Sequence, residues 1–142
     1  MRYRPALYLF AVLAASATVQ TVAHAAAAEI IVYSTSQIQL TNVPPGAQII
    51  ELDRLQQLEA RISHGLPANP QQAAHLIQQR MNNPEWRSIE GQVRKAAEDI
   101  AGAKSAGIRK VPAVTVDGSY VVYGASDVAA AVQQIQHARQ QR

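Results

Sequence analysis

Residues 111–124 decide the fold and read Val111-Pro112-Ala113-Val114-Thr115-Val116-Asp117-Gly118-Ser119-Tyr120-Val121-Val122-Tyr123-Gly124. Two runs rich in valine, the second flanked by tyrosines, favour β-strands, and Asp117-Gly118 separates them. An Asp-Gly pair suits a tight hairpin, because both central positions of a type I′ turn have positive φ. We therefore predict a β-hairpin. Tyr120 and Tyr123 should point to opposite faces of its second strand, one buried and the other exposed.

Upstream of the hairpin, the pattern predicts two strands and three helices. Residues 29–33 and 47–52 are β-branched or apolar runs and are predicted to form the first two strands. Apolar residues then recur at helical spacing from 53 to about 64, from 70 to 81, and from 84 to near Gly107. A final helix follows Ser126.

Capping residues mark the start of each predicted helix. An N-cap side chain accepts a hydrogen bond from a backbone N–H that the helix leaves free. We expect this role of Asp53 (with Gln56 reaching back to it), Asn69, Asn83 and Ser126. Both asparagines precede a proline, which the first helical position tolerates.

The apolar stripes of the helices predict which faces pack inward. For the helix that begins at Pro70 the stripe is Ala73, Ala74, Ile77 and Met81. For the next helix it is Ile89, Val93, Ala96, Ala97 and Ile100. For the last helix it is Val128, Ala129, Val132 and Ile135. The order of elements predicts an α/β fold: one domain over residues 26–142, with helices packed on a four-stranded mixed sheet.

The first 25 residues have the three parts of a secretory signal peptide. Arg2 and Arg4 give a positive start, an apolar stretch runs from Ala6 to about Ala17, and residues 23–25 read Ala-His-Ala. Polar residues dilute the second half of this segment, which disfavours a membrane anchor, since a span needs roughly 20 largely apolar residues. We expect cleavage after Ala25 and a periplasmic mature protein without a membrane span.

Composition excludes several kinds of chemistry. The sequence contains no cysteine, which rules out disulfides, a Cys-x-x-Cys redox pair, a cysteine nucleophile and thiolate zinc sites. Its 13 Lys and Arg residues face 10 Asp and Glu, but two of the basic residues lie in the signal segment. The local basic excess is Lys104, Arg109 and Lys110, so direct nucleic-acid binding is not expected.

Val111-Pro112-Ala113 at a strand start, followed by a hairpin and a terminal helix, resembles the C-terminal half of the thioredoxin-like fold. The resemblance implies that Pro112 is a cis proline facing the position of the redox motif. Here that position holds Ser34-Thr35-Ser36-Gln37, which cannot exchange a disulfide. Residues 34–46 are also barely long enough for a parallel crossover of about a dozen residues, so the first helix of the fold must be short or missing.

A second resemblance covers nearly all of the mature chain. A signal peptide, a strand ending in Ser or Thr, the leucine-rich helix before Gly65-Leu66-Pro67, the run Lys110 to Val114, and Tyr120 to Gly124 resemble a family of exported proteins from integrating conjugative elements. Membership implies a part in a type IV secretion-like DNA-transfer apparatus, with other periplasmic conjugation proteins as partners and no assigned biochemical activity.

The hydroxyl and imidazole groups lack the motifs of known catalytic or metal sites. Ser34, Thr35 and Ser36 are interpreted as turn and cap residues, because no Gly-x-Ser-x-Gly or Ser-x-x-Lys motif is present. The alternative is a periplasmic hydrolase that uses Ser34 or Ser36. His64, His75 and His137 lack metal-binding spacing, and we expect no metal and no cofactor.

Aromatic residues are the candidates for contacts with a partner. Trp86, near a helix start, is either a packing residue or an interface anchor. The outward member of Tyr120 and Tyr123 would lie at a sheet edge suited to an extended peptide. We expect a redox-inactive, non-catalytic binding or assembly factor of a conjugation apparatus.

Overall fold

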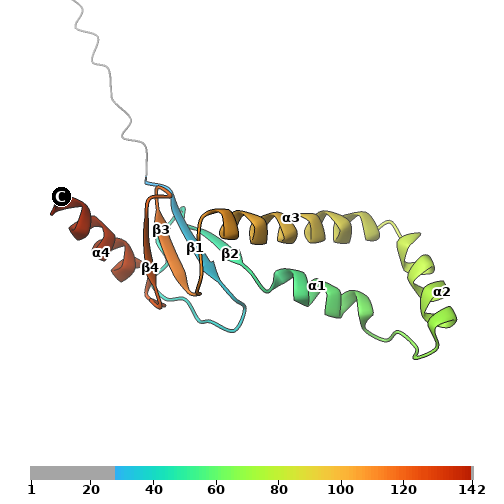
Figure 1. Ribbon diagram of the computed structural model, residues 1–142. Helices are drawn as coiled ribbons and strands as arrows, with labels where there is room; N and C mark the ends of the chain where they lie inside the picture. The colour runs from blue at the N-terminus through green and yellow to red at the C-terminus, as the bar shows by residue number, and fades with distance from the viewer. Residues whose placement is uncertain (1–27, 142) are drawn as a thin grey trace, which may run out of the picture.

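The computed structural model describes residues 28–141, so the predicted signal peptide lies outside the described residues. The elements in chain order are β1 (Ile30–Ser34), β2 (Gln48–Glu51), α1 (Arg54–Ser63), α2 (Pro70–Met81), α3 (Trp86–Ser105), β3 (Ala113–Val116), β4 (Tyr120–Tyr123) and α4 (Val128–Gln140). They form an α/β structure around a four-stranded mixed sheet, which confirms the predicted fold class (Figure 1).

The sheet has the strand order β2-β1-β3-β4. β1 pairs with β2 in parallel, whereas β1 with β3 and β3 with β4 are antiparallel. The hairpin turn has positive φ at both Asp117 (51°) and Gly118 (61°), as the Asp-Gly pair predicted. The Val111–Pro112 peptide bond is cis, as the resemblance implied.

No helix connects the two parallel strands. Residues 35–47 form an irregular crossover. Two backbone hydrogen bonds join its middle to the segment after β4: Thr41 N–H donates to Ser126 O at 2.9 Å, and Val128 N–H donates to Thr41 O at 3.0 Å. Leu40 and Val43 of this crossover pack against the core. The first helix that the thioredoxin-like resemblance implies is therefore absent, and the loop of residues 35–47, held by these hydrogen bonds, covers part of the sheet.

Two small cores occupy the two faces of the sheet. On one face α4 packs on the sheet and buries Val128, Val132 and Ile135 as predicted, whereas Ala131 is buried in place of Ala129, which is only partly so. The buried residues there are Val32, Val114, Val116, Val128, Ala131, Val132 and Ile135. On the other face the C-terminal end of α3 packs on β1, β2 and β3, and the buried residues are Tyr33, Ile50, Ala103 and Ala113.

Helices α1, α2 and α3 form an arm, defined here as residues 54–105, that extends from the sheet on the side away from α4 (Figure 1). Only Leu58, Ala96 and Ala103 are buried among its helical residues, and α2 contains none. The predicted stripes are therefore partly wrong: Ala74, Met81, Ala97 and Ile100 are exposed. The arm is thin, and α2 has little other than α1 and α3 to cover its apolar side.

The helix starts agree with the predicted caps in part. Asn69 caps α2, accepting from the N–H groups of Gln71 and Gln72 at 3.0 and 3.1 Å. α3 begins at Trp86, two residues after Pro84, and Asn83 Oδ1 accepts from Glu85 N–H instead. The prediction for Ser126 is wrong by one residue: α4 begins at Val128, and Asp127 caps it by accepting from Ala130 N–H at 3.0 Å.

Candidate functional site

The hydroxyl residues after β1 lie beside Pro112. The antiparallel register pairs Tyr33 with Ala113, which places Ser34 next to Pro112 at the following position. Ser34 is 2% exposed, and its hydroxyl donates to Thr35 O at 3.3 Å. A buried hydroxyl bonded to a backbone carbonyl satisfies its own polarity, and Ser34 is the last residue of β1 instead of the predicted turn or cap residue.

Ser36 joins the end of β1 to the start of α1. Its hydroxyl and its backbone N–H both donate to the Asp53 carboxylate, at 2.6 and 3.1 Å. Asp53 occupies the N-cap position of α1 but makes no side-chain capping bond. Its predicted capping role is wrong, because Ser36 takes the carboxylate that the helix would have used.

The contact with Ser36 also sets the protonation of Asp53. The hydrogen bond from the Ser36 hydroxyl lowers the pKa of Asp53 below its usual value, although burial opposes this shift. A carboxylate with a lowered pKa is a poor general base at neutral pH. In the described part of the chain no hydrogen bond joins Ser34 or Ser36 to a histidine or lysine. Through Ser36 and Asp53 this cluster joins the end of β1 to the start of α1.

The two hairpin tyrosines point to opposite faces of the sheet, as predicted. Tyr120 packs against the core on the α4 side, and Arg139 lies 4.7 Å from the centre of its ring. Tyr123 is 40% exposed on the other face, where its hydroxyl lies 3.4 Å from Gly107 O. Tyr120 is therefore the inward tyrosine and Tyr123 is the outward one.

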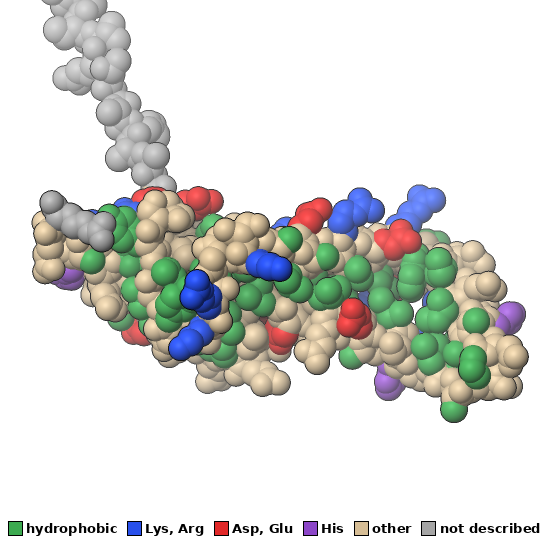
Figure 2. All heavy atoms as spheres, viewed as in Figure 1, with side chains coloured by type: hydrophobic (Ala, Val, Ile, Leu, Met, Phe, Trp, Pro, Cys, Tyr) green, Lys and Arg blue, Asp and Glu red, His purple; other side chains and the backbone are tan. Residues whose placement is uncertain are grey.

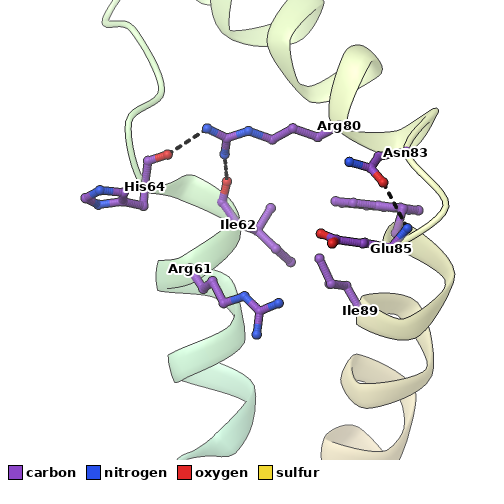
Figure 3. A pocket seen from close by; sticks show the side chains of 8 residues that line it. Arg61, Ile62, His64, Arg80, Asn83, Glu85 and Ile89 are labelled. Atoms are coloured by element: carbon purple, nitrogen blue, oxygen red, sulfur yellow. Dashed lines mark hydrogen bonds between the residues drawn. The ribbon is translucent and has the colours of Figure 1, made fainter.

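Trp86 lies at the far end of the arm, beside a pocket of about 270 Å³ between α1 and α3 (Figure 3). Ile62 and Ile89 face each other across this pocket in Figure 3, and Arg61, His64, Arg80, Asn83 and Glu85 complete its lining. A second pocket of about 490 Å³ shares Ile62, Trp86 and Ile89 with the first and adds Glu90, Val93 and Arg94. We call Ile62, Trp86 and Ile89 the arm cluster. It is an apolar strip bordered by hollows and charged side chains.

Arg80 fixes the shape of the first pocket. Its guanidinium donates to Ile62 O and, at 2.8 Å, to His64 O, the last carbonyls of α1 (Figure 3). A cation at a helix C-terminus satisfies carbonyls that lack intrahelical partners and matches the negative end of the helix dipole. Arg80 therefore joins the end of α2 to the end of α1.

The lining of the first pocket contains a mixture of predicted and unpredicted residues. Trp86 was predicted as a packing residue or an interface anchor, and it is half-buried with its indole N–H donating to Glu90 at 2.7 Å. Arg80 and Ile62 were not selected as site residues, because their contact joins positions far apart in sequence. A basic residue in the last turn of a helix was the one signal that could have singled out Arg80.

The histidines are dispersed. His64 and His75 lie in the arm, whereas His137 lies on α4. Across residues 28–141 no three His, Asp or Glu side chains come together in a way that could hold a metal ion. Nor does any helix of that part of the chain combine the length and apolar character needed to cross a membrane.

The family model described as "Protein of unknown function (DUF1525)" matches residues 27–141. The chain belongs to this family. The match spans the sheet and the arm alike, so both regions are part of what defines DUF1525. No curated protein and no solved structure matches the chain.

Proposed function

We propose that this DUF1525 protein is an exported, non-catalytic binding or assembly factor of a conjugation apparatus, and that its sheet region is a thioredoxin-like domain without a redox pair. The observation that carries the binding role is the arm cluster: a half-buried tryptophan and two isoleucines line adjoining hollows on an arm whose helices bury little. Tryptophan anchors flanked by polar and charged groups are typical of protein interfaces.

The thioredoxin-like part of the proposal has support from the topology. Pro112 precedes β3, lies beside the end of β1, and is followed by the hairpin and α4. These are the features on which the sequence resemblance relied. The lost first helix and the arm between β2 and α3 are departures from that pattern.

The partner at the arm cluster is proposed to be another protein. The hollows are lined by apolar surface with cationic and anionic side chains at their margins, a pattern typical of protein interfaces. The conjugation context and the export rest on the sequence resemblance and the signal segment. Export predicts that the mature protein begins near residue 26 and is recovered in the periplasmic fraction.

The test is the mating frequency of a donor with the gene deleted in frame, complemented by the wild-type, W86A or W86F protein. We expect deletion to lower transfer and the wild-type protein to restore it. W86F should restore most of it because an aromatic ring is kept at this position, and W86A should restore little. Equal amounts of each protein in the periplasm are the control. Unchanged transfer on deletion, or full rescue by W86A, would contradict the proposal.

The non-catalytic part has a separate test. A serine-reactive fluorophosphonate should leave Ser34 and Ser36 unlabelled in the folded protein, because one is buried and the other donates to a weakly basic carboxylate. Labelling that the S36A substitution abolishes would instead establish the hydrolase alternative.

A further inference from the structure

The outer edge of β4 presents backbone groups that pair with nothing in the sheet. β4 is the last strand in the order, and Gly124 N–H donates to Pro112 O at 2.8 Å. Hydrogen-bonded and non-hydrogen-bonded pairs alternate along an antiparallel ladder. Val122 and Tyr120 therefore turn their backbone groups toward β3, whereas Val121 and Tyr123 turn theirs away from the sheet.

The two edges of the sheet differ in protection. Proteins usually shield an edge strand with charge, proline or a covering segment. β2 carries Gln48 and Glu51 and follows a Pro-Pro-Gly run. β4 reads Tyr-Val-Val-Tyr, without charge or proline, and the side chains of Val121 and Tyr123 are 42% and 40% exposed. Within residues 28–141 its shortness is its one protective feature, so this edge is suited to pairing with another strand.

A row of side chains continues inward from this edge. Val121 is opposite Thr115, and Thr115 is opposite Ile31, so the three lie side by side on one face of the sheet. They line a pocket of about 280 Å³ together with Tyr33, Ala106, Ile108, Gly118, Ser119 and Tyr120. A strand added beside β4 would place alternate side chains next to Val121, at the margin of this pocket.

The charge beside the edge is positive. Lys104, Arg109 and Lys110 lie at the end of α3 and in the loop that leads to β3, and none of them is in an ion pair within residues 28–141. The Tyr123 hydroxyl lies 3.4 Å from Gly107 O, which brings this loop to the C-terminal end of β4. Figure 2 shows basic side chains gathered where α3 meets the sheet.

We propose that the outer edge of β4 binds an extended segment of another protein as a fifth strand, and that this segment carries acidic residues at the end that meets Lys104, Arg109 and Lys110. Main-chain hydrogen bonds to Val121 and Tyr123 supply the binding, and the basic residues supply the choice of partner. This surface lies on the sheet, away from the arm cluster, and the inference does not depend on the arm.

The test measures binding of two fluorescent peptides to the full chain by anisotropy. Both alternate valine and threonine; one ends in aspartates and the other in lysines. We expect the aspartate peptide to bind more tightly, with an advantage that shrinks as salt is raised. V121P removes an outward N–H without touching the ladder to β3 and should weaken binding about tenfold or more. V121T keeps the N–H and should bind like wild type.

A third probe leaves the protein unchanged, in case V121P does not fold. An aspartate peptide with N-methyl groups on the alternate amides that face β4 should lose binding, and one methylated on the other set should keep it. Equal binding of the two methylated peptides, or of the aspartate and lysine peptides, would overturn the proposal. So would a wild-type dimer that V121P dissociates, which assigns the edge to a second copy, or displacement of the peptide by a DNA oligonucleotide.

Discussion

The sheet and the arm bury apolar surface to very different extents. In the sheet region Val32 and Val114 are completely buried, and α4 and the crossover loop cover one face. In the arm, α2 has no buried residue and Met81 is 49% exposed. Because burial of apolar area is the main favourable term in folding, the sheet region has its own source of stability, whereas the arm depends on a few contacts and on the cap of α2.

The contrast predicts where the two regions expose binding surface. The sheet region has an edge strand without charge or proline, β4, which would bind a partner through directional backbone hydrogen bonds. The arm leaves an apolar strip exposed, and a partner would bind it by burying apolar area with a complementary shape. If both proposed surfaces bind, the protein would contact two partners at once, one by strand pairing and one by packing.

The largest expected effect is in the core of the sheet. V114A should lower the free energy of unfolding by about 2–3 kcal/mol, because the cavity lies among side chains that cannot collapse into it. I77A in α2 removes more atoms, but its side chain is only half-buried, so the cost should stay below about 1 kcal/mol. Urea unfolding followed by circular dichroism measures both. Equal costs at the two sites would break the comparison.

The next effect concerns the joint between α1 and α2. R80A removes the hydrogen bonds to Ile62 O and His64 O and should cost about 1–2 kcal/mol of local stability, after allowance for the solvent-exposed part of the side chain. Amide exchange in α2 should accelerate while exchange in β3 stays unchanged. R87A, an exposed arginine in α3, is the control. Acceleration in β3 as well would show that arm and sheet unfold together.

A smaller effect is expected at the cap of α2. N69A leaves the N–H groups of Gln71 and Gln72 without their acceptor and should cost about 1 kcal/mol. N69D keeps an acceptor and should behave like wild type. The loss should be visible as faster exchange within α2 and not as a shift in the urea midpoint of the sheet. A shifted midpoint would show that the arm unfolds in the same cooperative unit as the sheet.

The smallest effect lies at the joint between the regions and depends on pH. The hydrogen bond from the Ser36 hydroxyl lowers the pKa of Asp53 in the folded protein. The stabilisation that this bond gives the folded state is therefore present above the pKa that Asp53 has in the unfolded state, near 3.9. It is lost as pH falls through the lower folded pKa. S36A should therefore destabilise by less than about 1 kcal/mol at pH 7, because the site is partly solvated.

The difference between S36A and wild type should shrink as pH falls below about 4, since both then lose the charged carboxylate. Urea titrations at several pH values measure it. A difference that grows on acidification would mean that the hydroxyl interacts more strongly with the protonated acid than with the carboxylate.

Local chemistry sufficed to predict much of the fold. An Asp-Gly pair tolerates the positive φ that a type I′ turn has at two successive positions, so the hairpin turn followed from two neighbouring residues. Asn69 supplies an acceptor for the first helical N–H groups and Pro70 has no N–H to satisfy, so the cap of α2 also followed from neighbouring residues. The opposite faces of Tyr120 and Tyr123 followed from the period of a strand. The other strands and the helices were likewise predicted from the spacing of apolar residues along the chain.

The residues that the sequence placed wrongly are those with a tertiary competitor. Asp53 had the residue type and position of a cap, but Ser36, far away in sequence, offered two donors to the same carboxylate. The stripes of α2 and α3 predicted inward faces, but periodicity does not say whether another element is there to cover them.

The sequence by itself determined the alternation of strands and helices, the hairpin and its turn, the absence of cysteine and the cap of α2, because each depends on composition or on residues within a few positions of one another. The tertiary structure alone decided the parallel pairing of β1 with β2, the irregular crossover between them, the contact of Arg80 with the end of α1, and the open edge of β4. Those features join groups that are distant along the chain, and which of several possible partners a group meets is fixed only when the whole molecule packs.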